Sequence, residues 1–253
     1  MLPFLNIFGK QVPTYGLCFV IGIFLAVSVA WLLARKKDNI ESYDVIYAAV
    51  FAAVGAIGGA KLLFIIVNLG HIIAGRITLL QAFQGGFVFY GGLIGGIIGL
   101  FFYVKKFKLD SWTFFDLFAT VVPLGHAIGR VGCFLGGCCY GMEYDGPLHV
   151  VYPECIGNTP VGVPLFPVQL VEAALLVLLF VVLVIIYKKN PKPATQVLTY
   201  GFVYSLMRFV LEFFRGDKER GFLLGISTSQ LISLLFAFAL IAILIIRNKK
   251  SKE

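Results

Sequence analysis

The sequence predicts an all-α polytopic integral membrane protein with about seven transmembrane helices. Two observations support this fold class. Of the 253 residues, 59% are hydrophobic and only 13% are charged, whereas an ordinary soluble domain is about one quarter charged. The hydrophobic residues also gather in runs of about 20, the length that an α-helix needs to cross the hydrocarbon of a bilayer. We expect residues 1–253 to form a single transmembrane domain.

The first apolar run, Tyr15–Ala34, follows a weakly charged N-terminus and is succeeded by basic residues at 35–37. A cleaved signal peptide has the opposite charge order and a shorter run, so we expect this helix to remain as an anchor. The other expected helices are Val45–Asn68, Phe87–Val104, Trp112–Phe134, Val168–Tyr187, Val197–Phe214 and Ile226–Ile246.

Lysine and arginine residues gather after the first, third, fifth and seventh runs, at residues 35–37, 105–108, 188–192 and 247–252. Membrane topology therefore explains the net charge of +8 better than nucleic-acid binding, which would need a basic face. By the positive-inside rule, the N-terminus lies outside and the C-terminus is cytoplasmic. The longest connection, residues 135–167, then lies outside and contains neither lysine nor arginine. Because loops of this length are usually functional or disordered, a substrate-binding arm and a solvated connector both remain open.

The stretch His126–Gly141 combines a histidine, an arginine, three of the five cysteines and five glycines at membrane depth. A charged residue inside the hydrocarbon costs about 2.5 to 3.5 kcal/mol on insertion scales, so Arg130 is a functional candidate by default. Glycines allow the backbone to leave helical geometry beside a ligand. No acidic residue lies within a helical turn or two of Arg130, so its partner is a bound anion or one of the carboxylates Asp116, Glu172 and Glu212.

Other polar residues interrupt the expected helices. Arg208 and Glu212 are four residues apart and share one helical face, which suits a structural ion pair as well as a functional site. Lys61 follows two glycines and an alanine. It either binds a ligand or extends its side chain to the membrane surface. Gln169 and Glu172 lie in the first turns of the fifth run.

The five cysteines are an odd number for a disulfide framework, and Cys133, Cys138 and Cys139 are crowded together. Packing of small buried residues is the leading interpretation. A disulfide from Cys155 to one of the cluster is compatible with an outside loop. Zinc ligation with His149 is the third possibility, but the sequence lacks paired C-x-x-C motifs at zinc-ribbon spacing, so we expect no metal site.

These motifs together resemble the prolipoprotein diacylglyceryl transferase family, bacterial inner-membrane enzymes that attach a diacylglyceryl group to the lipobox cysteine of lipoprotein precursors. The similarity extends over nearly the whole chain. Its motifs are Tyr15-Gly16-Leu17, Gly59-Ala60-Lys61, Gly85-Gly86-Phe87, Tyr90 through Gly95, Gly129-Arg130-Val131-Gly132, Pro167 through Glu172, and Arg208 through Arg215.

The resemblance implies transfer of the diacylglyceryl group from phosphatidylglycerol to a cysteine sulfur, with release of glycerol phosphate. It implies phosphatidylglycerol, prolipoprotein signal peptides and membrane lipids as partners, no nucleic acid, a multi-pass location in the bacterial cell membrane, and no metal or organic cofactor. Arg130 and Arg208 match the family's two essential arginines, and guanidinium groups suit a departing phosphate because they stay protonated and bind its oxygens bidentately. Tyr90 and His126 are the candidates for activating the acceptor thiol. The expected substrate-binding residues are Arg130, Tyr15, Lys61, Gln169, Glu172, Glu212 and Arg215.

Four positions depart from the pattern of many family members. A histidine, an asparagine, a glutamate and a histidine are usual at the positions of Tyr90, Cys133, Cys138 and Phe166, respectively. These departures remove candidate general bases and leave two alternatives open: a family paralogue with a different acceptor, and a membrane thiol oxidoreductase that uses Cys138 and Cys139. A small-anion transporter would predict an internal repeat, and the sequence shows none.

Overall fold

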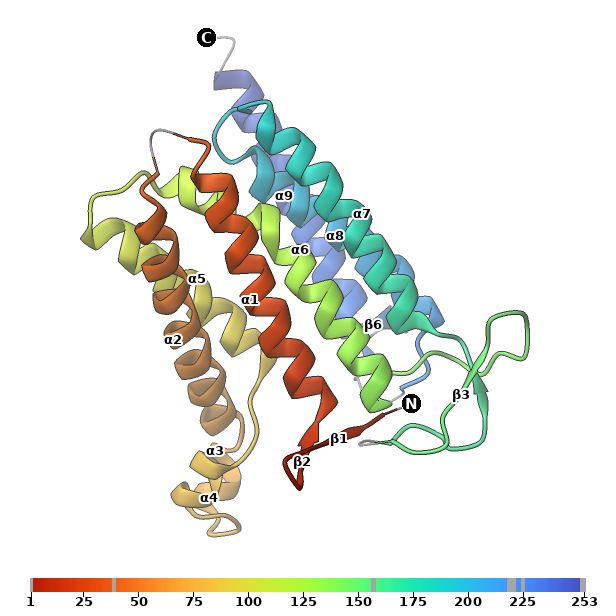
Figure 1. Ribbon diagram of the computed structural model, residues 1–253. Helices are drawn as coiled ribbons and strands as arrows, with labels where there is room; N and C mark the ends of the chain where they lie inside the picture. Colours follow the sequence, from red (N-terminus) through yellow and green to blue (C-terminus); the bar gives the residue numbers. More distant parts are fainter. Residues whose placement is uncertain (1, 38–39, 156–157, 218–221, 224–225, 251–253) are drawn as a thin grey trace. The chain divides into compact units, whose positions relative to one another are not determined.

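The computed structural model describes residues 2–37, 40–155, 158–217, 222–223 and 226–250 (Figure 1). Each of the seven expected apolar runs forms a helix, which confirms the predicted all-α class. These helices are α1 (Thr14–Ala34), α2 (Ser42–Val67), α5 (Phe89–Lys106), α6 (Ser111–Gly136), α7 (Val168–Lys188), α8 (Thr195–Leu211) and α9 (Thr228–Lys250). Residues 251–252 of the last basic cluster lie outside the described part of the chain.

Five helical stretches in the described residues are long and apolar enough to cross a membrane: α1, α2, α6, α7 and Thr195–Phe214. In α5, five glycines and two terminal lysines lower the apolar content. The described apolar part of α9, Thr228–Ile243, is shorter than a full span. The protein is therefore a multi-pass membrane protein, and the orientation of its termini stays a prediction.

Several short elements were not expected from the hydropathy. The helical ones are α3 (Leu69–Ile73), α4 (Leu79–Gln84) and the 3-10 turn η1 (Glu212–Phe214). Among the residues that the structure describes, the extended ones form three antiparallel hairpins: β1 (Phe4–Ile7) with β2 (Lys10–Pro13), β3 (Val150–Val151) with β4 (Pro164–Leu165), and β5 (Phe222–Leu223) with β6 (Ile226–Ser227). All of them are peripheral connections, so the layers of the fold are helical.

The chain divides into two compact units: a first unit of residues 1–29 and 116–253, and a second unit of residues 30–115. That all 253 residues act as one transmembrane domain stays a prediction.

In the second unit, α2 packs closely against α5 through glycines. A Cβ atom added to Gly59 would lie 2.3 Å from the carbonyl oxygen of Gly91, and one added to Gly95 would lie 2.1 Å from that of Gly55. Small residues let helix backbones approach in a membrane, where lipid is as apolar as the side chains and close packing drives association. This helix contact therefore explains the glycines of α2 and α5 that lie in it: Gly55, Gly59, Gly91, Gly95 and Gly99.

In the first unit, α8 packs against both α7 and α9, and the helices run in alternating directions (Figure 1). Ala127, Ala173 and Leu176 form a buried cluster that joins α6 to α7, with Tyr204 of α8 packed against it. Helices α1 and α6 approach at Gly22, where an added Cβ would lie 2.8 Å from the carbonyl oxygen of Gly125. This packing aligns the polar faces of α6, α7 and α8.

The connection after α6 is folded back on the helix ends instead of being a plain solvated segment. Tyr152 is 1% exposed and Leu165 is 1% exposed. Thr159 donates a hydrogen bond of 2.6 Å to the carbonyl oxygen of Gly137. The backbone N–H of Met142 donates to the carbonyl oxygen of Phe214, and that of Gly216 donates to the carbonyl oxygen of Tyr140. This connection therefore also pairs with the segment that follows α8.

Candidate functional site

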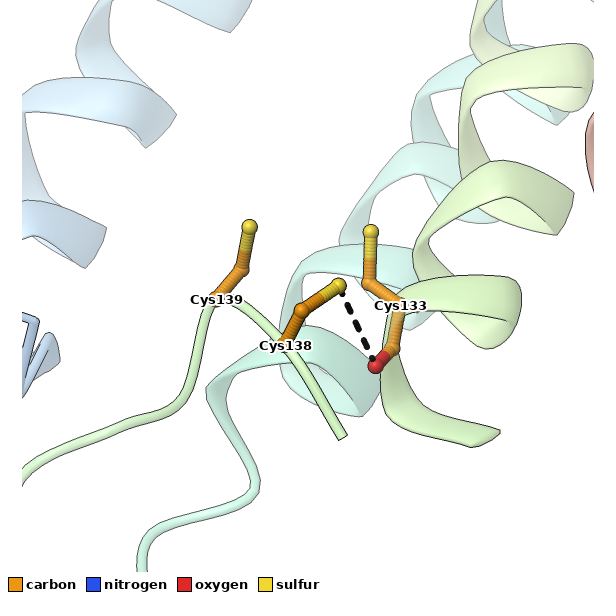
Figure 2. Close-up of side chains that lie close together, drawn as sticks. All are labelled: Cys133, Cys138 and Cys139. Carbon is orange, nitrogen blue, oxygen red and sulfur yellow. Dashed lines mark hydrogen bonds between the residues drawn. The ribbon is translucent and has the colours of Figure 1, made fainter. Parts of the chain in front are cut away.

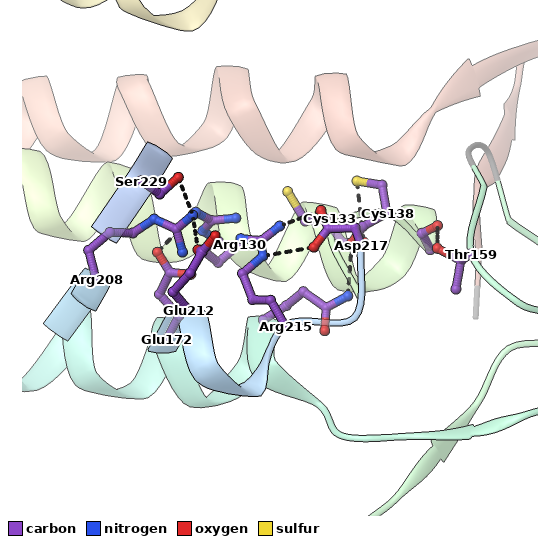
Figure 3. A network of polar contacts seen from close by, with 12 residues as sticks. Arg130, Cys133, Cys138, Thr159, Glu172, Arg208, Glu212, Arg215, Asp217 and Ser229 are labelled. Carbon is purple, nitrogen blue, oxygen red and sulfur yellow. Dashed lines mark hydrogen bonds and ion pairs between the residues drawn. The ribbon is translucent and has the colours of Figure 1, made fainter. Parts of the chain in front are cut away.

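Glu172 of α7 is the carboxylate that faces Arg130 of α6. The carboxylate oxygen Oε1 lies 3.0 Å from Nη2 of Arg130, and the Glu172 side chain is 1% exposed (Figure 3). The same oxygen lies 3.7 Å from Nε2 of His126, which is four residues before Arg130 and on the same helical face. Of the three carboxylates that the sequence offered to Arg130, the structure places Glu172 beside it.

Arg208 and Glu212 form the ion pair that their spacing predicts. Nη2 of Arg208 lies 2.7 Å from Oε2 of Glu212, and both side chains are largely buried. The same nitrogen donates a hydrogen bond of 3.3 Å to Oγ of Ser229, which begins α9 (Figure 3). Arg208 is therefore held between two helices.

Two buried guanidinium donors lack an acceptor. Nε of Arg130 and Nη1 of Arg208 have no hydrogen-bond partner among the described residues. A buried charged donor without an acceptor is costly, and phosphate oxygens are acceptors that arginine binds strongly. The pair of arginines therefore suits an anionic ligand.

Arg215 lies just beyond η1 and is bound by a carboxylate that sequence reasoning missed. Its Nε and Nη2 donate to Oδ1 and Oδ2 of Asp217 at 3.1 and 3.0 Å. The backbone of Arg215 pairs with Gly141, which brings the end of α8 beside the segment after α6. Burial raises the pKa of the Asp217 carboxyl, and the Arg215 guanidinium opposes this shift. Only Gly216 separates the two charged residues in sequence, a local signal that could have revealed the pair.

Gln169 joins the start of α7 to the connection that follows α6. Its Nε2 donates to the carbonyl oxygen of Cys138 at 2.8 Å and to Oη of Tyr152 at 3.0 Å. The side chain is buried, and its Oε1 has no hydrogen-bond partner within the described part of the chain. These contacts position the connection, and a direct role of Gln169 in substrate binding stays a prediction.

Tyr15 begins α1 with its backbone against Gly132, where an added Cβ would lie 3.3 Å from the Cα atom of Tyr15. Its side chain is 43% exposed and stacks on Phe19, with ring centroids 6.4 Å apart. The absence of a side chain at Gly132 therefore lets the start of α1 approach the Arg130 motif. Substrate binding by Tyr15 stays a prediction.

Lys61 and Tyr90 belong to the second unit. Nζ of Lys61 donates to the carbonyl oxygens of Gly85 and Gly86 at 2.7 and 3.0 Å and lies 4.2 Å from the ring centroid of Phe87. Lys61 therefore holds the turn that precedes α5, a more specific role than extension to the membrane surface. Tyr90 lies in the first turn of α5, is 45% exposed and contacts the ring of Phe89. Their roles toward substrate stay predictions.

Two tyrosines that the sequence analysis did not single out line the arginine site. Tyr204 of α8 lies against His126, with ring centroids 5.3 Å apart, and Tyr200 stacks on Tyr204 at 5.8 Å. Tyr200 and Tyr204 precede Arg208 and Glu212 at successive spacings of four residues. This four-residue repeat places them on one side of α8 and could have identified them from the sequence.

Within the described part of the chain, three thiols form a group that could hold a metal ion. Cys133, Cys138 and Cys139 place their sulfur atoms within 4.8 Å of one another (Figure 2). None of the five cysteines forms a disulfide in this structure, so the disulfide alternative from Cys155 is absent from it. His149, the other ligand considered, does not belong to this group.

The chain is similar to one family over nearly all of its length. A sequence model described as prolipoprotein diacylglyceryl transferase matches residues 3–246. The chain is 34% identical over 229 residues to the phosphatidylglycerol–prolipoprotein diacylglyceryl transferase of Clostridium tetani, with 90% of each chain covered. It is 32% identical over 254 residues to phosphatidylglycerol–prolipoprotein diacylglyceryl transferase 2 of Clostridium perfringens, with 98% of this chain and 96% of the relative covered. The relative of that name from Dehalococcoides mccartyi strain 195 is 32% identical over 252 residues, with coverages of 96% and 92%.

Proposed function

Because the chain belongs to the prolipoprotein diacylglyceryl transferase family, we propose that it transfers the diacylglyceryl group of phosphatidylglycerol to the lipobox cysteine of prolipoproteins. The reaction releases glycerol phosphate and takes place in the bacterial cell membrane. The names of the relatives support the two substrates. The observation that supports this chemistry in the chain itself is the pair of buried guanidinium donors of Arg130 and Arg208 that lack an acceptor among the described residues.

The reaction exchanges a carbon–oxygen bond for a carbon–sulfur bond. The acceptor thiolate attacks the carbon of the diacylglyceryl group that is bonded to a phosphate oxygen. The electron pair of the broken carbon–oxygen bond leaves with that oxygen, as part of glycerol phosphate. The phosphodiester has one negative charge and the departing phosphomonoester has two, so the enzyme must stabilise one additional charge. Positively charged donors aimed at that oxygen in a water-poor site lower the barrier most effectively.

Arg130 and Arg208 are suited to this stabilisation because they are fixed before the lipid arrives. Glu172 holds Arg130 at 3.0 Å, and Glu212 holds Arg208 at 2.7 Å. A guanidinium group remains protonated and presents several donors in one plane, which fits two phosphate oxygens at once. We assign the free donors Nε of Arg130 and Nη1 of Arg208 to the departing phosphate.

Removal of the acceptor proton requires a base. His126 lies beside Arg130, because Oε1 of Glu172, which contacts Arg130, is 3.7 Å from Nε2 of His126, and Tyr204 packs against the His126 ring. Histidine is the residue that most often serves as a general base in enzymes. We therefore assign thiol activation to His126, and Tyr90 of the second unit is the other candidate.

The test measures transfer of labelled diacylglyceryl from phosphatidylglycerol to a lipobox peptide by the purified full chain. We expect Arg130→Ala and Arg208→Ala to lower the rate by at least about 100-fold, the size of effect seen when one transition-state donor is removed. Arg76→Ala removes an exposed cation outside the proposed site and serves as the matched control. The variant with serine at all five cysteine positions should retain transfer, because the proposed chemistry uses the thiol of the acceptor.

Two outcomes would overturn the proposal. Absence of transfer by folded wild-type protein that still binds phosphatidylglycerol would point to a different acceptor. Loss of transfer in the cysteine-free variant, with transfer retained in both arginine variants, would favour chemistry at the thiols of Cys138 and Cys139.

A further inference from the structure

The sulfur atoms of Cys133, Cys138 and Cys139 lie within 4.8 Å of one another at the end of α6 (Figure 2). Cys133 lies in the last turn of the helix, and the other two lie on the chain that follows it. Nothing in the transfer chemistry requires these three side chains.

The end of α6 explains why the first two thiols meet. Gly137 has a φ of +66°, a left-handed conformation that ends the helix. Its N–H donates to the carbonyl oxygen of Phe134 at 3.3 Å, and the N–H of Cys138 donates to that of Cys133 at 3.0 Å. These two bonds define a Schellman cap, in which the side chains that occupy the positions of Cys133 and Cys138 normally contact each other.

The third thiol is brought in by a second left-handed residue. Cys139 has a φ of +57°, which is uncommon for a residue with a side chain. This conformation turns the chain so that its sulfur lies within 4.8 Å of the other two. Thiol packing alone needs no such conformation, whereas a common ligand for the three sulfurs would stabilise it.

Two positively charged side chains belong to the segments around the thiols. Arg130 lies three residues before Cys133 in α6, and the backbone of Arg215 pairs with that of Gly141, two residues after Cys139. Three thiolates and a divalent cation carry a net charge of −1, which these guanidinium groups would compensate. Figure 3 shows Arg130, Arg215, Cys133 and Cys138 in the same close-up.

The cluster is also accessible. Cys133 is buried, but Cys138 and Cys139 are both partly exposed. Three protein ligands with an open fourth position are a common arrangement for zinc, and thiolate sulfur selects soft cations over magnesium or calcium.

We propose that Cys133, Cys138 and Cys139 form a three-thiolate site for a soft divalent cation such as Zn²⁺, with the fourth position open. Each thiol that coordinates the cation gives its proton to solvent, and no oxidation or reduction takes place. The site needs none of the lipid substrates, so its occupancy is independent of the transferase proposal.

The experiment uses purified, metal-free full chain in detergent with a reductant that does not bind metal. Cd²⁺ is the probe, since its thiolate complexes absorb in the ultraviolet, and Zn²⁺ is then added as a competitor. We expect the wild type to bind one Cd²⁺ per chain with release of protons, and Zn²⁺ to displace it. Cys138→Ser and Cys139→Ser should each weaken binding at least tenfold. Cys18→Ser and Cys155→Ser replace cysteines that do not belong to the cluster and should bind as the wild type does.

The measurement on the wild type does not depend on how well any variant folds. A folded wild type that shows no thiolate absorption with Cd²⁺ would overturn the proposal, as would equal binding by Cys139→Ser and Cys18→Ser. Because binding is measured without lipid or peptide, failure here leaves the transferase assay unaffected, and failure of transfer leaves this result unaffected.

Discussion

Replacing Glu172 with glutamine keeps the shape of the side chain and removes its charge, which leaves Arg130 as a buried cation without its carboxylate. The Glu172 side chain is 1% exposed and lies 3.0 Å from Arg130, whose side chain is 14% exposed. Removing one partner of a buried ion pair costs about 3 to 5 kcal/mol, and the partial exposure of Arg130 favours the lower end, about 3 kcal/mol. With a shift of about 2 to 4 °C per kcal/mol for a chain of this size, we expect Tm to fall by about 6 to 12 °C.

The assay is thermal unfolding of the purified protein with increasing phosphatidylglycerol. The lipid phosphate can supply the negative charge that Glu172→Gln removes, so the lipid should raise Tm more in this variant than in the wild type. Glu41→Gln is the matched control, because Glu41 is exposed and its side chain makes no capping hydrogen bond. We expect Glu41→Gln to unfold at the wild-type temperature.

A double variant tests whether the two charges act as a pair. Arg130→Met combined with Glu172→Gln removes both charges, so we expect it to recover most of the lost Tm, because no buried charge is then left alone. The reasoning is refuted if the effects of the two single changes simply add in the double variant. It is also refuted if Glu172→Gln unfolds at the same temperature as Glu41→Gln.

Three further predictions follow from the packing and the topology. Gly59→Ala should lower Tm and the yield of folded protein because the new Cβ would lie 2.3 Å from the Gly91 carbonyl oxygen; Gly58→Ala, with nothing within 4 Å, should leave both unchanged. Equal effects of these two changes would contradict the α2–α5 packing. Gln169→Leu should cost about 1 to 3 kcal/mol, since it leaves the Cys138 carbonyl oxygen without its side-chain donor, and should speed hydrogen exchange in residues 137–167. Unchanged exchange there would show that Gln169 does not hold this connection. The third prediction is a cytoplasmic C-terminus. A C-terminal green fluorescent protein fusion should then fluoresce and a C-terminal alkaline phosphatase fusion should be inactive, whereas the reverse result would place the C-terminus outside.

Hydropathy and helical spacing determined the features that depend on one segment at a time. The seven long helices could be predicted because the bilayer imposes a length and a composition on each span independently of its neighbours. The ion pair of Arg208 and Glu212 could be predicted for a similar reason, since the helical repeat brings residues four apart together. The Schellman cap is equally local, and the glycine at 137 after a cysteine-bearing helix could have indicated contact between Cys133 and Cys138.

The short hairpins were missed because each of their strands has only two to four residues. The first hairpin turns at Phe8 and Gly9, which have φ values of +50° and +77°, and only the glycine gives a recognisable turn signal. In so short a segment, the alternation of polar and apolar residues is too brief to distinguish a strand from a loop.

The sequence alone determined that this is a membrane protein of the diacylglyceryl transferase family with arginines in its helices, because a charge in hydrocarbon is conspicuous wherever it lies. Only the tertiary structure decided which carboxylate faces Arg130, because Glu172 approaches it from another helix and three acidic residues were equivalent in sequence. It likewise decided that Arg215 lies beside the segment after α6, through the backbone pairing with Gly141. Partners within one helix follow from its periodic geometry, whereas partners on different elements depend on how these elements pack, which no local pattern encodes.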